Sequence, residues 1–169
     1  MKIENSQPRD IPKIFELYRI ATEYMKSKNQ VHWPEFQESL IANEIEEFRQ
    51  WKMIIDEEIA CIWAIAFKDE LIWADGTKDP SLYIHRIATN PIYRGRNLVK
   101  ELVNWANQFG KGLSLKYIRM DTVGLNQGLI GHYQKFGFEF LGTKTLVNTR
   151  GLPAHYKDGE VCYFQKKII

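Results

Sequence analysis

The sequence predicts an α/β protein with a mixed β-sheet and helices on both faces of that sheet. Along the chain, apolar residues change from the three-and-four spacing of amphipathic helices to the shorter β-rich runs of strands. Residues 82–123 run strand, helix, strand, which predicts a parallel pair by the right-handed crossover rule. Hairpins on either side predict antiparallel pairs. The expected order of elements is β-α-α-β-β-β-α-β-α-β-β.

The N-terminal half is expected to form a short strand, two helices and a hairpin. Asp10 precedes the first helix and Pro12 stands in its first turn, where the missing N–H of proline costs nothing. Apolar residues then recur at helical spacing as far as Met25. A second helix is expected over residues 34–49, and residues 56–58 are expected to join the two strands of the hairpin.

The C-terminal half alternates strands with helices, and turn-forming residues separate them. Asp69–Pro80, with the turn dipeptide Asp75-Gly76, is expected to be mainly loop. Asn90-Pro91 ends a long strand because proline cannot donate to a sheet ladder. Helices are expected from about Leu98 to Phe109 and from Asn126 to Phe136. The expected strands are Lys2–Asn5, Trp51–Ile55, Ile59–Phe67, Leu82–Thr89, Tyr117–Val123, Phe138–Val147 and Val161–Lys166.

Length and composition restrict the class of protein. A chain of 169 residues fits one domain that can fold without a disulfide or a metal. A net charge of +2 with no basic stripe argues against a nucleic-acid binder. No apolar run is long enough for a membrane span, and the first ten residues are polar rather than signal-like. Cys61 and Cys162 are far apart in the sequence, which favours a reducing compartment, so a cytoplasmic protein is expected.

The segment Arg94-Gly95-Arg96-Asn97 lies between a strand and the helix that follows it. The start of a helix leaves free N–H groups and carries a partial positive charge, so a short loop leading into it can hold a phosphate. Arg94, Arg96 and Lys100 add full positive charges there. The loop alone fits equally well an ordinary turn with solvated basic residues.

A second segment, residues 126–138, ends its helix with the pattern Tyr-x-x-x-Gly-Phe at Tyr133–Phe138. Together with the loop and the element order, it makes nearly the whole chain resemble the GNAT acetyltransferase superfamily. The resemblance implies a single N-acetyltransferase domain over residues 1–169 with acetyl-CoA as acyl donor. The family's loop pattern, Gln/Arg-x-x-Gly-x-Gly/Ala, falls on Arg94 to Val99, with Asn97 and Val99 at its last two glycine or small positions. Asn97 is expected to keep the turn because asparagine tolerates positive φ.

The resemblance also implies contacts to the cofactor. The backbone of three strand residues would pair with the pantetheine arm like an added strand. Loop amides would hold the pyrophosphate, and Asn126 would reach the cofactor from the neighbouring helix. The strand residues are Ile87, Ala88 and Thr89, and the loop residues are Arg94, Gly95, Arg96, Asn97, Leu98 and Val99.

Two residues are expected to carry the chemistry. Tyr133 matches the family position whose phenol faces the cofactor sulfur, and the alternative is a tyrosine packed on the sheet. Ser81 stands where many relatives have a carboxylate base. His85 is therefore the expected base, since histidine titrates in the right range and arylalkylamine acetyltransferases resemble this chain there; a structural histidine is the alternative. Asp121 and Arg86 are either a second base with a substrate clamp or a structural ion pair.

The identity of the acceptor is not specified by the sequence. A small-molecule amine is the default, and a peptide or protein amine stays open. His32 and His132 have no partner at metal-ligand spacing, so no metal is expected. The residues expected near the acceptor are Tyr83, Trp33, Trp73 and His155.

The leading hypothesis is direct transfer of an acetyl group from acetyl-CoA to a primary amine in a ternary complex. The alternative is a non-catalytic acyl-CoA-binding regulatory module, which is favoured by Asn97, by Val99 and by the missing carboxylate at Ser81. No nucleic-acid or membrane partner is expected. A homodimer through the last strands is left open because edge strands can pair with a second copy.

Overall fold

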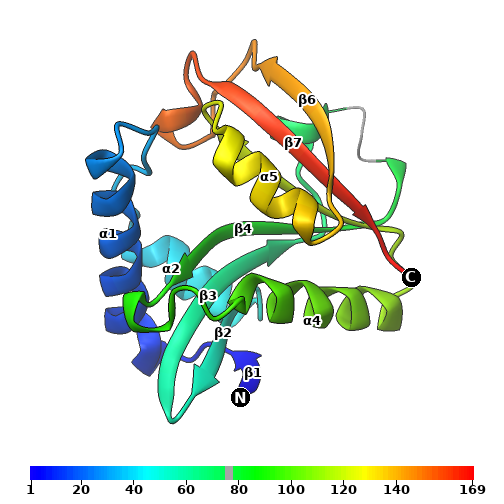
Figure 1. Cartoon of the computed structure of the whole chain (residues 1–169). Helices are drawn as coiled ribbons and strands as arrows, with labels where there is room; N and C mark the ends of the chain where they lie inside the picture. The colour runs from blue at the N-terminus through cyan, green and yellow to red at the C-terminus, as the bar shows by residue number, and fades with distance from the viewer. Residues whose placement is uncertain (75–77) are drawn as a thin grey trace. The chain divides into compact units, whose positions relative to one another are not determined.

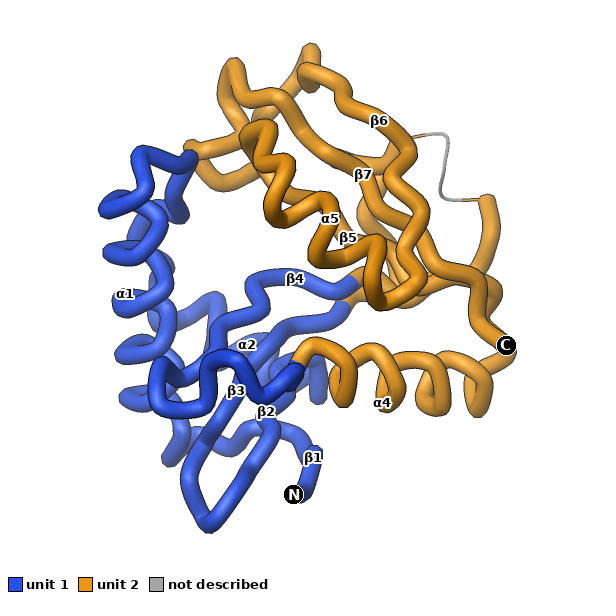
Figure 2. Tube along the Cα trace, viewed as in Figure 1, with its two compact units in different colours: residues 1–65, 84–98 blue, residues 66–83, 99–169 orange. Residues whose placement is uncertain are grey.

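The computed structural model describes residues 1–74 and 78–169. The chain divides into two compact units, which Figure 2 colours separately. Unit 1 comprises residues 1–65 and 84–98, and unit 2 comprises residues 66–83 and 99–169. Each unit contains one free cysteine, Cys61 in unit 1 and Cys162 in unit 2, and both side chains are fully buried.

Unit 1 contains an antiparallel meander whose hairpin turn is strained. Strand β1 (Lys2–Asn5) pairs with β2 (Gln50–Ile55), and β2 pairs with β3 (Glu58–Ala66). Asp56 and Glu57 connect β2 to β3 with φ angles of +50° and +64°. Two consecutive left-handed residues are the signature of a type I′ turn, and they join the hairpin that the sequence predicted at residues 56–58.

The two long helices of unit 1 cover the same apolar cluster. Helix α1 (Ile11–Ser27) follows a short 3₁₀ turn, η1 (Pro8–Asp10), and helix α2 (Glu38–Glu46) is shorter than predicted. Residues 34–37 precede α2 without helical structure, and α2 ends before Phe48, whose φ is +57°. The shared cluster consists of Ile14, Leu17, Tyr18, Phe36, Ile41, Ile45, Ile62 and Ala88.

Strand β4 (Ser81–Thr89) contributes residues to both units. In unit 2 its first residues pair in parallel with β5 (Tyr117–Val123), with Ser81 opposite Tyr117. The pairing agrees with the parallel pair that the crossover rule predicts. The order of strands is β1-β2-β3-β4 in unit 1 and β4-β5-β7-β6 in unit 2.

The remaining strands of unit 2 are antiparallel, so parallel and antiparallel pairs occur together and the predicted α/β class with a mixed sheet is confirmed. Strand β7 (Glu160–Lys167) pairs along β5 on one side and β6 (Glu139–Thr145) on the other. Short 3₁₀ turns follow β4 and precede β7, namely η3 (Pro91–Tyr93) and η4 (Ala154–Tyr156).

Unit 2 contains three helices among its described residues (Figure 1). Helix α4 (Leu98–Gly112) has its first residue in unit 1, and α5 (Gln127–Lys135) starts one residue after the sequence predicted. A short helix, α3 (Glu70–Trp73), lies in the stretch that was expected to be loop, and the predicted Asp75-Gly76 turn lies outside the described residues. No described helix is both long enough and apolar enough to cross a membrane.

Candidate active site

The end of β4 is anchored to β3 within unit 1 by one asparagine. The backbone N–H of Asn90 donates to the carbonyl oxygen of Ala60 at 2.9 Å, and its side-chain nitrogen donates to the carbonyl of Ile59 at 3.2 Å. The side-chain oxygen accepts from the N–H of Ile92 at 3.3 Å. Its carbonyl also accepts from the N–H of Tyr93 at 2.9 Å, so Asn90 ends the strand and starts the next turn with four hydrogen bonds, which fix the point where the loop begins.

The loop after this turn has the backbone that its sequence predicts. Tyr93 is buried and donates its phenol O–H to the carbonyl of Ile55 at 3.1 Å. Gly95 has a φ of +80° and Asn97 a φ of +56°, so asparagine does take the left-handed conformation expected of it. Within the described part of the chain, the amides of Gly95 and Asn97 donate to no acceptor. Such amides, close to a helix start, are suited to bind an anion.

The two arginines of the loop lie over aromatic rings of unit 1. The guanidinium carbon of Arg94 is 4.7 Å from the ring centre of Tyr24 on α1, and that of Arg96 is 5.1 Å from the ring of Tyr93. Both arginines are exposed. A cation held over a ring face keeps its N–H groups available at the edge, so both side chains can still donate to phosphate.

Strand β4 contains an irregular residue just before its predicted cofactor segment. Arg86 has a φ of +52°, which a non-glycine residue in a strand rarely adopts. Beyond it, Ala88 is buried in the core of unit 1, while Ile87 and Thr89 are half-buried. The backbone of the strand is therefore irregular at Arg86, a feature that no pattern in the sequence predicted.

Arg86 is held by a carboxylate from α2. Its guanidinium NH2 group donates to both oxygens of Glu44 at 2.5 Å, and its Nε donates to the phenol oxygen of Tyr18 at 3.4 Å. The side chain of Glu44 is 4% exposed. Of the two interpretations of Arg86 drawn from the sequence, a structural ion pair is the one observed, but its carboxylate is Glu44 rather than the expected Asp121.

His85 lies beside this charged network and is half-buried. Burial, together with the positive charges of Arg86 and Arg49, lowers the pKa of His85 to about 3. The imidazole is therefore neutral at pH 7. A neutral ring can accept a hydrogen bond, but its conjugate acid is too acidic to keep a proton taken from an alkylammonium.

In unit 2, α5 carries the two helix residues assigned by the resemblance. Asn126 caps the helix, and its side-chain oxygen accepts from the N–H of Leu129 at 3.0 Å. The side-chain nitrogen remains available to donate to a cofactor. Tyr133 is 8% exposed, and its ring packs edge-on against Phe164 at 5.2 Å and Phe138 at 6.1 Å. Its ring is thus fixed against strand β7.

Two of the expected acceptor residues lie in one aromatic cluster of unit 2. Trp73 and Tyr83 meet edge-on at 5.8 Å between ring centres, and Trp73 meets Tyr163 at 5.0 Å. All three are at least nine-tenths buried. His155 lies next in sequence to Tyr156 of the same cluster, and Trp33 lies in unit 1, where it lines a pocket.

Two carboxyls next to this cluster have pKa values near neutrality. Burial raises the pKa of Asp121 to about 6, although the O–H of Tyr156 donates to its Oδ2 at 2.6 Å. Burial and the charge of Asp121 raise the pKa of Asp69 to about 7. Both values lie in the range that suits a general base at pH 7. The sequence indicated Asp121 but not Asp69, which lies at the start of α3 in the stretch expected to be loop.

Comparison with known proteins decides the family. Residues 14–138 match the model of the Acetyltransferase (GNAT) family. The chain belongs to this family. The match covers the loop, His85 and Tyr133, and it confirms the family that the sequence resembles.

Among curated proteins, the chain is similar to the uncharacterized N-acetyltransferase YesJ of Bacillus subtilis. The two are 29% identical over 91 residues, which is 52% of this chain and 51% of that protein. The match therefore spans about half the length of the curated relative. Family and relative support the expected enzyme class, an N-acetyltransferase.

Solved structures of GNAT proteins share the fold over nearly the whole chain. An acetyltransferase of Listeria monocytogenes is 22% identical with a TM-score of 0.74, and one of Streptococcus agalactiae is 21% identical with a TM-score of 0.76. Each comparison covers 98% of this chain and 94% of the other. At these identities the likeness establishes the fold.

Proposed function

We propose that this GNAT protein transfers an acetyl group from acetyl-CoA to a primary amine by direct attack in a ternary complex. The observation that carries the proposal is the loop after β4. Gly95 and Asn97 both have positive φ, their amides have no acceptor in the described part of the chain, and Arg94 and Arg96 lie beside them. This is the backbone and charge arrangement that a pyrophosphate requires.

The residues of the loop fit the cofactor that the family uses. The amides of Gly95 and Asn97, with those at the start of α4, would hold the pyrophosphate, because backbone donors do not depend on the side chains of Asn97 and Val99. The amides of Arg94 and Arg96, which the resemblance also implied, already donate to the carbonyls of Pro91 at 3.2 Å and Tyr93 at 3.4 Å. The backbone of Ile87–Thr89 would pair with the pantetheine arm. Acetyl-CoA, when bound, supplies the thioester carbonyl that the amine attacks.

Deprotonation of the amine is the main energetic problem for the site. At pH 7 about one lysine-like amine in a thousand is neutral, a cost of roughly 4 to 5 kcal/mol. We assign His85 to accept a hydrogen bond from the amine, since its lowered pKa keeps the ring neutral. The same low pKa means that His85 alone does not hold the proton, and Asp121, with a pKa of about 6, is better matched to that step.

Tyr133 would stabilise the negative charge that develops on the leaving sulfur. A phenol of pKa ~10 does not readily protonate a thiolate whose conjugate acid has a pKa near 8.5, so we assign it a hydrogen bond rather than full proton transfer. The packing of Tyr133 against Phe138 and Phe164 would hold the hydroxyl in place. A small-molecule amine is the proposed acceptor, and a peptide amine is the alternative that the assay must include.

Acetyl-CoA binding tests the loop by calorimetry on the cofactor-free protein. Gly95→Glu places a carboxylate where a pyrophosphate would lie, and we expect affinity to fall about 100-fold, close to 3 kcal/mol. Gly142→Glu is the matched control. Gly142 also has positive φ, +98° against +80° for Gly95, and an added Cβ meets nothing within 4 Å at either position. Equal affinity in both variants would overturn the assignment of the loop.

Turnover separates an enzyme from a non-catalytic acyl-CoA-binding module. With a panel of small amines and short peptides, release of the coenzyme thiol should fall about 100-fold in Tyr133→Phe while acetyl-CoA affinity is retained. Binding without turnover on any amine would favour the binding module. Unchanged turnover in Tyr133→Phe would refute the role of Tyr133.

A further inference from the structure

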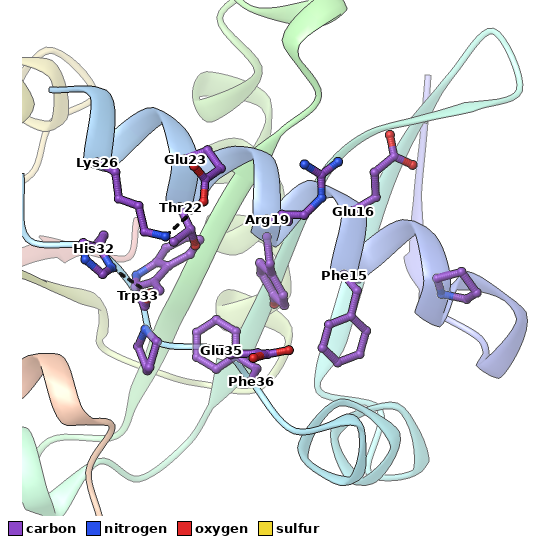
Figure 3. A pocket seen from close by; sticks show the side chains of 13 residues that line it. Phe15, Glu16, Arg19, Thr22, Glu23, Lys26, His32, Trp33, Glu35 and Phe36 are labelled. Carbon is purple, nitrogen blue, oxygen red and sulfur yellow. Dashed lines mark hydrogen bonds and ion pairs between the residues drawn. The ribbon is translucent and has the colours of Figure 1, made fainter.

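A pocket of about 550 Å³ lies in unit 1 between α1 and residues 32–36 (Figure 3). This volume is within the usual range for sites that bind small molecules. Its walls come from one face of α1 and from the segment that precedes α2. Among the lining residues, only Trp33 is one that the sequence analysis expected near the acceptor.

The pocket lies on the face of α1 that is turned away from the cofactor loop. Phe15, Arg19, Thr22 and Lys26 recur every three or four residues, which places them on one face of the helix. Tyr24, which packs against Arg94 of the loop, is five residues from Arg19 and therefore roughly 140° around the helix from it. A ligand in this pocket would not occupy the proposed pyrophosphate site.

Aromatic side chains form much of the pocket. Trp33 lies 5.7 Å from Tyr18 and 6.1 Å from Phe36, measured between ring centres, and both Phe36 and Phe15 line the same space. In Figure 3, Phe15 and Phe36 lie near Glu35, while Lys26 and His32 lie at the other end. One end of the pocket therefore combines ring faces with a carboxylate.

Most charged groups of the lining already have a partner. Glu23 binds Lys26 at 3.0 Å, and Glu16 binds Lys13 at 3.0 Å. Glu35 and Arg19 have no ion-pair partner within residues 1–74 and 78–169, and they do not bind each other. The pocket thus presents one negative and one positive group, both exposed, beside an aromatic surface.

We propose that this pocket binds the zwitterion of a free α-amino acid with an aromatic or large aliphatic side chain. Glu35 would accept hydrogen bonds from the ammonium group, and the guanidinium of Arg19 would donate to the carboxylate. Trp33, Phe15 and Phe36 would cover the apolar side chain. A ligand with only one charge would leave either Glu35 or Arg19 without a counter-ion.

Calorimetry with L-phenylalanine tests the proposal in the absence of acetyl-CoA. We expect binding that weakens about tenfold or more for phenethylamine, which lacks the carboxylate, and for 3-phenylpropionate, which lacks the ammonium group. L-Leucine should bind and glycine should bind much more weakly, because glycine has no apolar side chain. Equal affinities for phenethylamine and L-phenylalanine would refute the proposal that the pocket recognises the zwitterion.

Variants locate the binding in this pocket. Glu35→Gln and Arg19→Gln should each lower the affinity for L-phenylalanine about tenfold or more. Glu38→Gln and Arg9→Gln are matched controls, since both residues are exposed and do not line the pocket. No heat with L-phenylalanine up to roughly 10 mM, or unchanged affinity in both pocket variants, would refute the site. Gly95→Glu should leave amino-acid binding intact, so failure of the proposed acetyl transfer is distinguishable.

Discussion

Each unit contains an arginine that is largely removed from solvent, and the groups around the two arginines differ. In unit 1, Arg86 donates to both oxygens of the buried Glu44. In unit 2, Arg119 is 5% exposed, donates to neutral oxygens of Gln165 at 2.8 Å and Tyr83 at 3.1 Å, and lies 4.9 Å from the ring centre of Trp73. Arg86 thus has a carboxylate in addition to the hydroxyl of Tyr18 and the rings of Tyr18 and Phe36, whereas the Arg119 contacts named here are to a hydroxyl, an amide and a ring. Loss of the carboxylate beside Arg86 should therefore cost more stability than loss of one neutral partner of Arg119.

Glu44→Gln should have the largest effect on stability. It leaves a buried guanidinium without its counter-charge, so the free energy of unfolding in urea should fall by about 3 to 5 kcal/mol. The double variant Glu44→Leu with Arg86→Met should recover most of this loss, because it removes both charges. A fall below about 1 kcal/mol in Glu44→Gln would contradict a buried pair.

Gln165→Leu should cost less than Glu44→Gln. It removes one hydrogen bond to a charged group, while the Tyr83 hydroxyl and the ring of Trp73 remain, so about 1.5 to 3 kcal/mol is expected. Urea unfolding under the same conditions gives the direct comparison. A loss as large as that of Glu44→Gln would show that a neutral partner of Arg119 contributes as much as the carboxylate beside Arg86.

Tyr156→Phe in unit 2 should lower the free energy of unfolding by an amount that depends on pH. The pKa of Asp121 is raised from 3.8 to about 6, so its contribution to stability is present below about pH 4 and is lost as the pH rises through 6. Without the Tyr156 hydroxyl the pKa rises further, and the ionised carboxylate loses its donor. We expect a loss of about 1 to 2 kcal/mol at pH 8 and a smaller one at pH 5. Equal losses of stability at pH 5 and pH 8 would contradict a hydrogen bond from Tyr156 that stabilises the ionised form of Asp121.

A substitution in the hairpin turn of unit 1 should give the smallest effect, which is a gain in stability. Asp56 and Glu57 both have positive φ, which costs a glutamate more than an asparagine or a glycine. Replacing the pair by Asn-Gly should raise the free energy of unfolding by about 1 kcal/mol, measured by urea denaturation. A decrease would mean that the side chains of the turn stabilise it in the native protein.

Local patterns in the sequence predicted most of the elements and the backbone of the loop. The spacing of apolar residues placed α1 and β1–β3, and the tolerance of asparagine for positive φ anticipated Asn97. The missed features depend on distant residues. Glu44 binds Arg86 across 42 positions, and the low pKa of His85 arises from Arg86 and Arg49 together with burial. Neither the Glu44–Arg86 pair nor the pKa shift of His85 produces a periodic pattern of apolar residues in the sequence. The sequence analysis missed Asp69 because α3, with four residues, is too short to show a helical spacing of apolar residues.

The positions of the two cysteines give each unit its own reporter of local opening. Cys61 and Cys162 are fully buried, and burial raises the pKa of the Cys61 thiol to about 12 and that of Cys162 above its ordinary value. A thiol reagent reacts with the thiolate, so neither residue should be modified until the backbone around it opens. Timed alkylation followed by peptide mass spectrometry would therefore measure how often each unit opens, without any introduced label.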